Sequence, residues 1–66
     1  MSQQDLISVL YSKYGAQLLS KKQTANELNI SEGTLDNMRR AGTITSKKVS
    51  GQIMFTLTEV SRFLSE

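Results

Sequence analysis

The feature that most constrains the fold of this chain is a pair of short helices, which capping residues mark out near the middle of the sequence. Ser20 followed by Gln23 has the spacing of a capping box at the start of the first helix. Asn29 tolerates the left-handed conformation that ends a helix, Ser31 can cap again, and Gly42 lies where the second helix would stop. Two helices this short, joined by so tight a turn, must cross steeply, which is the helix-turn-helix arrangement.

Apolar residues give each helix of the pair one face that can be buried, at Ala25, Leu28, Ile30, Leu35 and Met38. Ile30 precedes the second cap and Leu35 lies four positions into the helix, which is the spacing of a hydrophobic staple. Leu35 and Met38 then define the buried direction of the second helix. Leu18 and Leu19 are expected to lead into the first helix.

Upstream of the pair, the sequence predicts another helix over residues 3–14, which Ser2 caps and Gly15 stops. Its apolar stripe consists of Leu6, Ile7, Leu10 and Tyr14. In the simplest interpretation this stripe covers a small core. The alternative is a contact with a second copy of the protein, through Val9 and Tyr11 beside the stripe.

Downstream of the pair, the pattern changes to the alternation of strands and predicts a hairpin over residues 46–56. A three-residue loop at 50–52 would set Val49 opposite Ile53 on one face of this hairpin. Phe55, in the second strand, is expected in the core. The hairpin would therefore form a wing beside the helix-turn-helix.

A last helix is predicted over residues 58–65, starting either at Thr56 with Glu59 or at Thr58 alone. Its inward residues are expected to be Val60, Phe63 and Leu64. The predicted fold class is α+β, mainly α: a winged helix-turn-helix with a two-stranded hairpin wing, an extra N-terminal helix and a short C-terminal helix. We expect the chain to form one domain, 1–66, with helix 3–14, the helix-turn-helix 20–42, the wing hairpin 46–56 and helix 58–65.

Composition argues against several classes of function. A chain of 66 residues without cysteine or histidine has no disulfides, no usual zinc site and no histidine base. No catalytic, metal or cofactor-binding residues and no small-molecule ligand are therefore expected. No apolar run reaches membrane-spanning length and the first ten residues lack the basic start of a signal peptide, so a cytoplasmic protein is expected.

Positive charge is concentrated in one part of the chain. The net charge is only +2, but residues 21–48 contain all except two of the eight lysines and arginines. This distribution is typical of a phosphate-binding face, although a solubilising surface would look similar.

The second helix of the pair offers polar groups that suit base recognition. Gly33, Asp36, Asn37 and Arg40 point away from the buried direction, with Thr34 and Arg39 on the flanks. Asn37 can pair with an adenine edge, Arg40 with guanine or a phosphate, and Asp36 can accept from cytosine. Alternatively, Asp36 and Arg40 stand four residues apart and form an ion pair within the helix.

Lys21 and Lys22 occupy the first turn of a helix, where the macrodipole disfavours positive charge. This placement brings no visible gain in folding, so it suggests a docked phosphate, with chance placement as the alternative. The candidate DNA-binding residues are Lys21, Lys22, Ser31, Gly33, Thr34, Asp36, Asn37, Arg39 and Arg40 in the helix pair, and Lys47, Lys48, Ser50 and Gln52 in the wing.

The run LLSKKQTANELNISEGTLDNMRRAGTITSKKVSGQIMFTLTEVSRFL, in residues 18–64, resembles the excisionase-like branch of the MerR superfamily of small winged-helix proteins. In that family a leucine-rich lead-in precedes a helix-turn-helix, a basic hairpin ending in an apolar strand and a short helix of the type xxDVxxFL. Two positions depart from the family pattern. Thr45 replaces a usual proline, and Gln52 replaces an arginine often found past the glycine of the wing, which weakens the contacts assigned to the wing.

The resemblance implies sequence-specific binding of double-stranded DNA, with the wing on the neighbouring minor groove or its backbone. It implies either an excisionase-type accessory factor that directs the integrase of a phage or mobile element, or a small transcriptional regulator. The expected partner is double-stranded DNA, together with either further copies of the protein, bound cooperatively or as a dimer on adjacent sites, or an integrase. The expected location is the cytoplasm, associated with the nucleoid, for a bacterial or phage protein. A competing hypothesis is a protein-interaction module that docks a partner through its first helix, which Glu32, Asp36 and the missing wing arginine favour.

Overall fold

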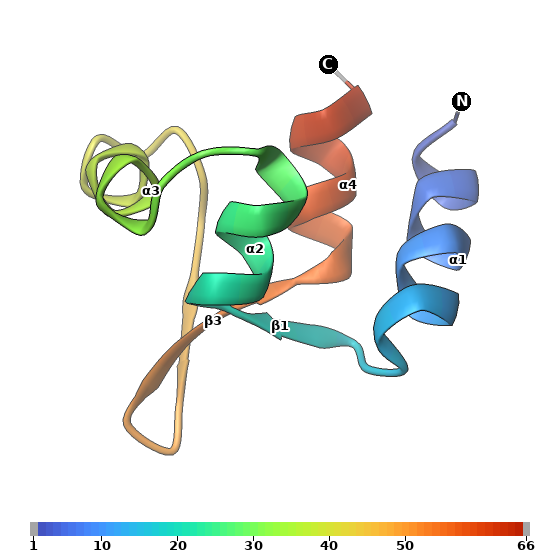
Figure 1. Ribbon diagram of the computed structural model, residues 1–66, viewed down its shortest axis with the longest axis horizontal. Coiled ribbons are helices and arrows are strands. Elements are labelled where there is room, and N and C mark those ends of the chain that lie inside the picture. The colour runs from blue at the N-terminus through green and yellow to red at the C-terminus, as the bar shows by residue number, and fades with distance from the viewer. Residues whose placement is uncertain (1, 66) are drawn as a thin grey trace.

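The computed structural model describes residues 2–65, which form helices around a small three-stranded sheet (Figure 1). The elements in chain order are α1 (Gln3–Tyr14), β1 (Leu18–Ser20), α2 (Lys21–Leu28), α3 (Glu32–Arg40), β2 (Lys47–Val49), β3 (Gln52–Thr56) and α4 (Leu57–Ser65). This arrangement confirms the predicted α+β, mainly helical, winged helix-turn-helix. None of the helices in the described part of the chain has the length and apolar character needed to cross a membrane.

The predicted caps form the turn between α2 and α3. The Ser20 hydroxyl accepts from the Gln23 backbone N–H at 3.1 Å, and the Gln23 side chain accepts from the Ser20 N–H at 2.9 Å. Asn29 ends α2 in the left-handed conformation, at φ 59°. Ser31 then caps α3 by accepting from the Thr34 N–H at 3.1 Å. These local bonds fix the length of both helices and the tightness of the turn.

The end of α3 is closed by a glycine in the left-handed conformation. Gly42 has φ 80°, and its N–H donates to the Arg39 carbonyl at 3.2 Å. The Thr43 N–H donates to the Met38 carbonyl at 2.9 Å, which completes a Schellman motif. The chain therefore leaves α3 abruptly and turns toward the hairpin.

The sheet contains a strand that the sequence analysis does not predict. Leu18 and Leu19 lead into α2 as expected, but with Ser20 they form a strand, β1. It pairs antiparallel with β3 and puts Leu19 opposite Phe55. Leu19 is fully buried, while Ser20 both ends the strand and caps α2. The strand order is β1-β3-β2, so β3 is central. Three residues are too few to show the two-residue period of a strand, so the sequence alone does not predict β1.

The hairpin is confirmed, but its predicted register is wrong. Ser50 and Gly51 both have positive φ, of 51° and 80°, and form a two-residue loop of the primed type that suits hairpins. Val49 therefore lies opposite Gln52 rather than Ile53. Because side chains alternate across a strand, Val49 and Ile53 are on different faces, and Val49 is 40% exposed.

The core draws residues from all four helices, from strands β1 and β3 and from the segment after α3. Its buried apolar residues are Leu10, Leu19, Ala25, Leu35, Ile44, Phe55, Leu57 and Val60. Phe55 is buried as predicted, whereas Leu64 is exposed rather than inward-facing. Helix α4 begins at Leu57, one residue earlier than predicted, and the Thr56 hydroxyl caps it by accepting from the Glu59 N–H at 3.1 Å.

Helix α1 packs along α4 on the side of the molecule away from α3 (Figure 1). A polar contact also ties its last turn to α2: Glu27 accepts from the Tyr14 hydroxyl at 2.7 Å and from the Lys13 ammonium at 3.0 Å. The hydrogen bond from Tyr14 is the main reason why the pKa of Glu27 is lowered, and the same bond raises the pKa of Tyr14. Val9 and Tyr11 remain exposed on this helix.

Candidate nucleic-acid interface

Helix α3 presents a continuous solvent-exposed ridge. Leu35 is fully buried and Met38 packs against the core, so the helix is fixed from behind. The exposed residues of its cap and outer face are Ser31, Glu32, Gly33, Thr34, Asn37 and Arg40. The angular argument from the sequence agrees with this exposure, and with the half-buried position of Arg39 on the flank, but not for Asp36, which is half-buried rather than exposed.

Gly33 leaves open space on this ridge. A Cβ built there would meet nothing closer than the Ser31 hydroxyl oxygen at 3.9 Å, and the backbone of Gly33 is ordinary helix. Neither packing nor backbone conformation within the molecule requires a glycine at this position. Because glycine inside a helix costs stability relative to alanine, its presence suits close approach by a partner.

One alternative from the sequence is an ion pair between Asp36 and Arg40. This alternative is wrong, because Asp36 pairs with Lys21 and Arg39 instead. Its carboxylate lies 3.1 Å from the Lys21 ammonium on α2 and 3.5 Å from the Arg39 guanidinium. The side chain is 23% exposed and faces α2 rather than pointing straight outward. The hydrogen bond from Lys21 is the main cause that lowers the pKa of Asp36. We refer to Asp36 with Lys21 and Arg39 as the Asp36 bridge.

The bridge distinguishes the two lysines at the start of α2. Lys21 has an ionic partner within the protein, because its ammonium lies 3.1 Å from the carboxylate of Asp36 on α3. Lys22 is exposed and makes no ion pair within the described part of the chain. The two neighbouring lysines therefore have different electrostatic environments.

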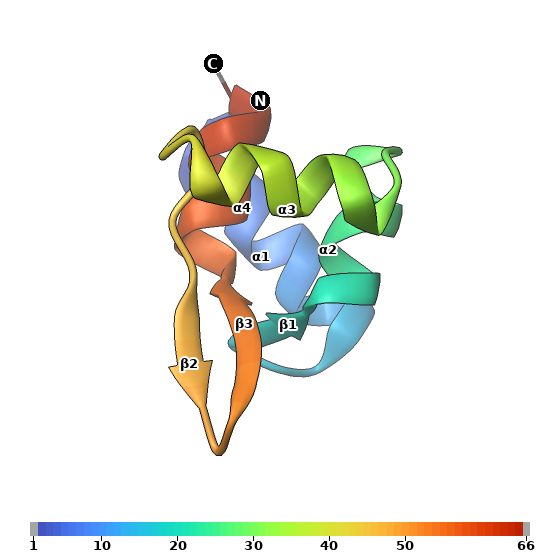
Figure 2. The ribbon, with the colours of Figure 1, turned by 90° about the vertical axis from the view of Figure 1, so that its left-hand side faces the viewer.

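The wing presents its polar residues on both faces. Lys47 lies opposite Met54 and Lys48 opposite Ile53, so the two lysines point to different faces of the hairpin. Lys47, Lys48, Ser50 and Gln52 are all exposed. Figure 2 shows that α3 and the hairpin lie on one side of the molecule, with α1 behind them. Helix α3 and the wing, which contain most of the candidate residues, thus lie on the same side of the molecule.

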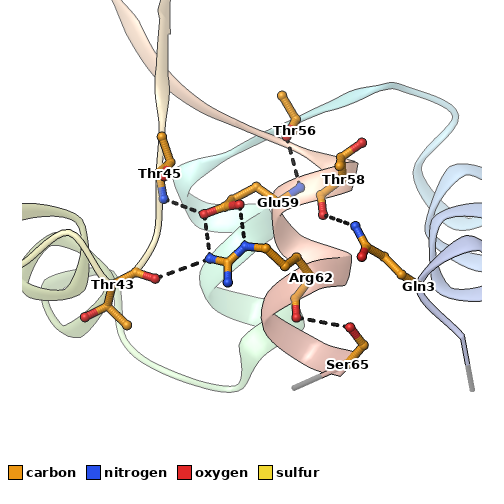
Figure 3. Close-up of polar contacts among 8 residues, drawn as sticks. All are labelled: Gln3, Thr43, Thr45, Thr56, Thr58, Glu59, Arg62 and Ser65. Atoms are coloured by element: carbon orange, nitrogen blue, oxygen red, sulfur yellow. Dashed lines mark hydrogen bonds and ion pairs between the residues drawn. The ribbon is translucent and has the colours of Figure 1, made fainter.

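A polar clamp on α4, which the sequence analysis did not identify, fixes the segment between α3 and the wing (Figure 3). Glu59 accepts from the Thr45 backbone N–H at 2.8 Å and from two nitrogens of Arg62, both at 2.9 Å. Arg62 also donates to the Thr43 carbonyl at 3.5 Å. Chiefly because of the hydrogen bonds from Arg62, the pKa of Glu59 is lowered from 4.5 to about 2.

Thr45 is the position where the resembled family usually has proline. Proline has no N–H, so it could not make the bond that Thr45 donates to Glu59. The replacement therefore exchanges the stiffness of a proline ring for a hydrogen bond to a carboxylate. The departure from the family pattern at Thr45 was thus the one sign of this clamp in the sequence.

Comparison with known proteins places most of this architecture in one family. A family model described as a helix-turn-helix domain matches residues 18–66, which begins at β1 and leaves α1 outside the match. No curated protein and no solved structure matches the chain.

Proposed function

The chain belongs to the helix-turn-helix domain family, and on this premise we propose that it binds double-stranded DNA sequence-specifically through α3 and the β2–β3 wing. In this proposal α3 enters the major groove and the wing contacts the neighbouring minor groove or its backbone. The observation that supports it most is the position of the exposed α3 ridge on the same side as the wing. A binding surface that spans two grooves needs this arrangement.

The ridge provides the chemistry for direct recognition of bases. Asn37 is exposed and can make a bidentate contact with an adenine edge, while Arg40, almost one helical turn further on, can contact guanine or a phosphate. Gly33, near the start of the same ridge, lets the helix backbone approach the groove closely. Thr34 adds a hydroxyl donor at the beginning of the helix, and the Ser31 hydroxyl orients it by donating to its Oγ1 at 2.9 Å.

The surrounding cations provide contacts with phosphate. Lys22, Arg40, Lys47 and Lys48 make no ion pair with any residue from 2 to 65. Each phosphate that such a side chain neutralises lowers the logarithm of the binding constant by about 0.9 per tenfold rise in salt. Four such contacts give modest affinity for one copy, so specificity is expected to require several copies on neighbouring sites. Ser50 and Gln52 contribute hydrogen bonds at the wing tip.

We propose that the protein uses this DNA binding in one of two roles, as an excisionase-type accessory factor in recombination or as a small transcriptional regulator. In either role it would belong to a phage or mobile element and act in the bacterial cytoplasm. The resemblance of residues 18–64 to the excisionase-like branch of the MerR superfamily supports both. Repeated, cooperatively bound sites and a contact with an integrase would favour the recombination role. One palindromic site that overlaps a promoter would favour the regulator.

Selection of bound oligonucleotides from a random pool tests the proposal and reports the spacing and symmetry of the site. With the selected site, Asn37→Ala and Arg40→Ala should each weaken binding about tenfold or more, as expected for loss of a bidentate base contact. Lys13→Ala removes the same charge as Arg40→Ala, but from α1, and should change affinity little. If no sequence is enriched, or if all three variants bind alike, the proposal is wrong.

A second candidate function is a protein-interaction module, which the exposed Val9 and Tyr11 on α1 favour. A partner docked on α1 should be released by Tyr11→Ala and should not respond to Arg40→Ala. DNA binding should show the opposite pattern, so the same two variants separate the two functions.

A further inference from the structure

We propose that Asp36 is a specificity-determining residue: in the free protein its carboxylate occupies Lys21 and Arg39 where a DNA phosphate would otherwise bind, and this occupation reduces binding to arbitrary sequence. The inference rests on the proposed DNA-binding function and adds a role for an acidic residue within a basic surface.

The distances show that Asp36 forms ion pairs with two cations, Lys21 and Arg39. The two carboxylate oxygens lie 3.1 and 3.2 Å from the Lys21 ammonium, and one of them lies 3.5 Å from Arg39. Of the six cations between residues 21 and 48, two are thus held by an internal anion. A phosphate that binds either of them must compete with this carboxylate.

The Asp36 bridge is also loose enough to exchange. Arg39 donates to Asp36 only at 3.5 Å, and its Nε is buried without a hydrogen-bond partner within residues 2–65. A buried donor without a partner is unfavourable, so the guanidinium gains if an anion with more acceptor oxygens replaces the carboxylate. Lys21, with a side chain that is 31% exposed, can rotate outward to the same phosphate.

The effect of Asp36 on specificity depends on which contacts hold the protein on the correct site and on an arbitrary sequence. On an arbitrary sequence, almost all of the affinity comes from phosphate contacts, so competition by Asp36 for two of the six cations weakens it directly. On the correct site, base contacts by Asn37 and Arg40 supply affinity that does not depend on Lys21 or Arg39. Asp36 thereby lowers sequence-independent affinity more than it lowers affinity for the correct site.

The test measures binding of the full chain to a mixed-sequence duplex from about 50 to 200 mM salt, by fluorescence anisotropy. Asp36→Asn should bind this duplex more tightly, and the slope of log K against log salt should steepen by about one to two, because up to two more cations contact phosphate. The ratio of affinities for the selected site and the mixed duplex should fall. Glu32→Gln is the matched control, since it makes the same charge change on the exposed side of α3 without any ion pair in the described chain.

Equal slopes for Asp36→Asn and Glu32→Gln would overturn the inference, because bulk charge alone would then explain the gain. A second comparison does not depend on folding of the Asp36 variant. Lys22→Met should reduce the salt slope of the wild-type protein by about one, and Lys21→Met by clearly less, because Lys21 is already paired. Equal losses from the two lysines would refute the role of Asp36 and leave DNA binding standing, whereas a wild-type protein that binds no duplex would refute the proposed function itself.

Discussion

Replacing Glu59 by glutamine tests how firmly the clamp on α4 holds the segment that leads from α3 to the wing. Glutamine keeps the shape and can still accept from the Thr45 N–H, but it removes the charge that Arg62 contacts at two points. The change therefore isolates the ionic part of the clamp with little effect on packing.

The expected magnitude follows from the pKa of Glu59. The difference between 4.5 and about 2 corresponds to about 3 kcal/mol, at about 1.4 kcal/mol for each tenfold change in proton affinity. The side chain of Arg62 is 39% exposed and water screens the ion pair, so we expect Glu59→Gln to lower the free energy of unfolding by only about 2 kcal/mol. Total stability for a chain of this length is only about 3–10 kcal/mol.

The sign of the pH dependence is set by the lowered pKa. The stabilisation from the Glu59 carboxylate is present above pH 4.5 and is lost as the pH falls toward about 2. The free energy of unfolding of the wild type should therefore exceed that of Glu59→Gln by about 2 kcal/mol at pH 6, and this difference should disappear at low pH.

Urea unfolding followed by circular dichroism, at fixed ionic strength and a series of pH values, measures this gap. Arg62→Met serves as the companion variant, because loss of the main partner should raise the pKa of Glu59 and flatten the acid dependence. A gap between wild type and Glu59→Gln that stays constant from pH 6 to pH 2 would show that the charge of Glu59 contributes nothing to the clamp.

Three further predictions concern other parts of the molecule. Gly33→Ala should stabilise the protein by about 0.5–1 kcal/mol and yet weaken binding to the selected site, because only a partner needs the open space; thermal melting and anisotropy check the two effects, and stabilisation with unchanged binding would contradict close approach. Leu19→Ala should cost about 2–5 kcal/mol in urea unfolding, since Leu19 is fully buried; a smaller cost would mean that β1 contributes little to the core. Tyr14→Phe should raise the pKa of Glu27 toward its ordinary value and cost about 1 kcal/mol of stability; an NMR titration that finds Glu27 unmoved would refute the contact.

The sequence was most informative where structure is decided locally. Capping is such a case: Ser20, Asn29 and Ser31 act on backbone groups within a few residues, so their spacing predicted both helices and the turn. The buried face of α3 was also predictable, because Leu35 and Met38 define it through helical geometry alone.

The features that escaped prediction depend on partners distant in sequence. Leu19 becomes a strand residue only because Phe55 lies beside it, and Asp36 turns toward α2 only because Lys21 is placed there by the turn. The hairpin register was wrong for a local reason: Ser50 adopts a positive φ that is uncommon for serine, so the loop is one residue shorter than the sequence suggested.

The position of α1 has a consequence for anyone who shortens this protein. The segment that matches the family begins at residue 18, yet the buried core includes Leu10, and α2 receives polar contacts from the last turn of α1. A fragment trimmed to the family segment would expose to water the side of α4 that packs against α1 and would leave Glu27 without its donors. We therefore expect the smallest autonomous folding unit of this chain to be larger than the motif by which its family is defined.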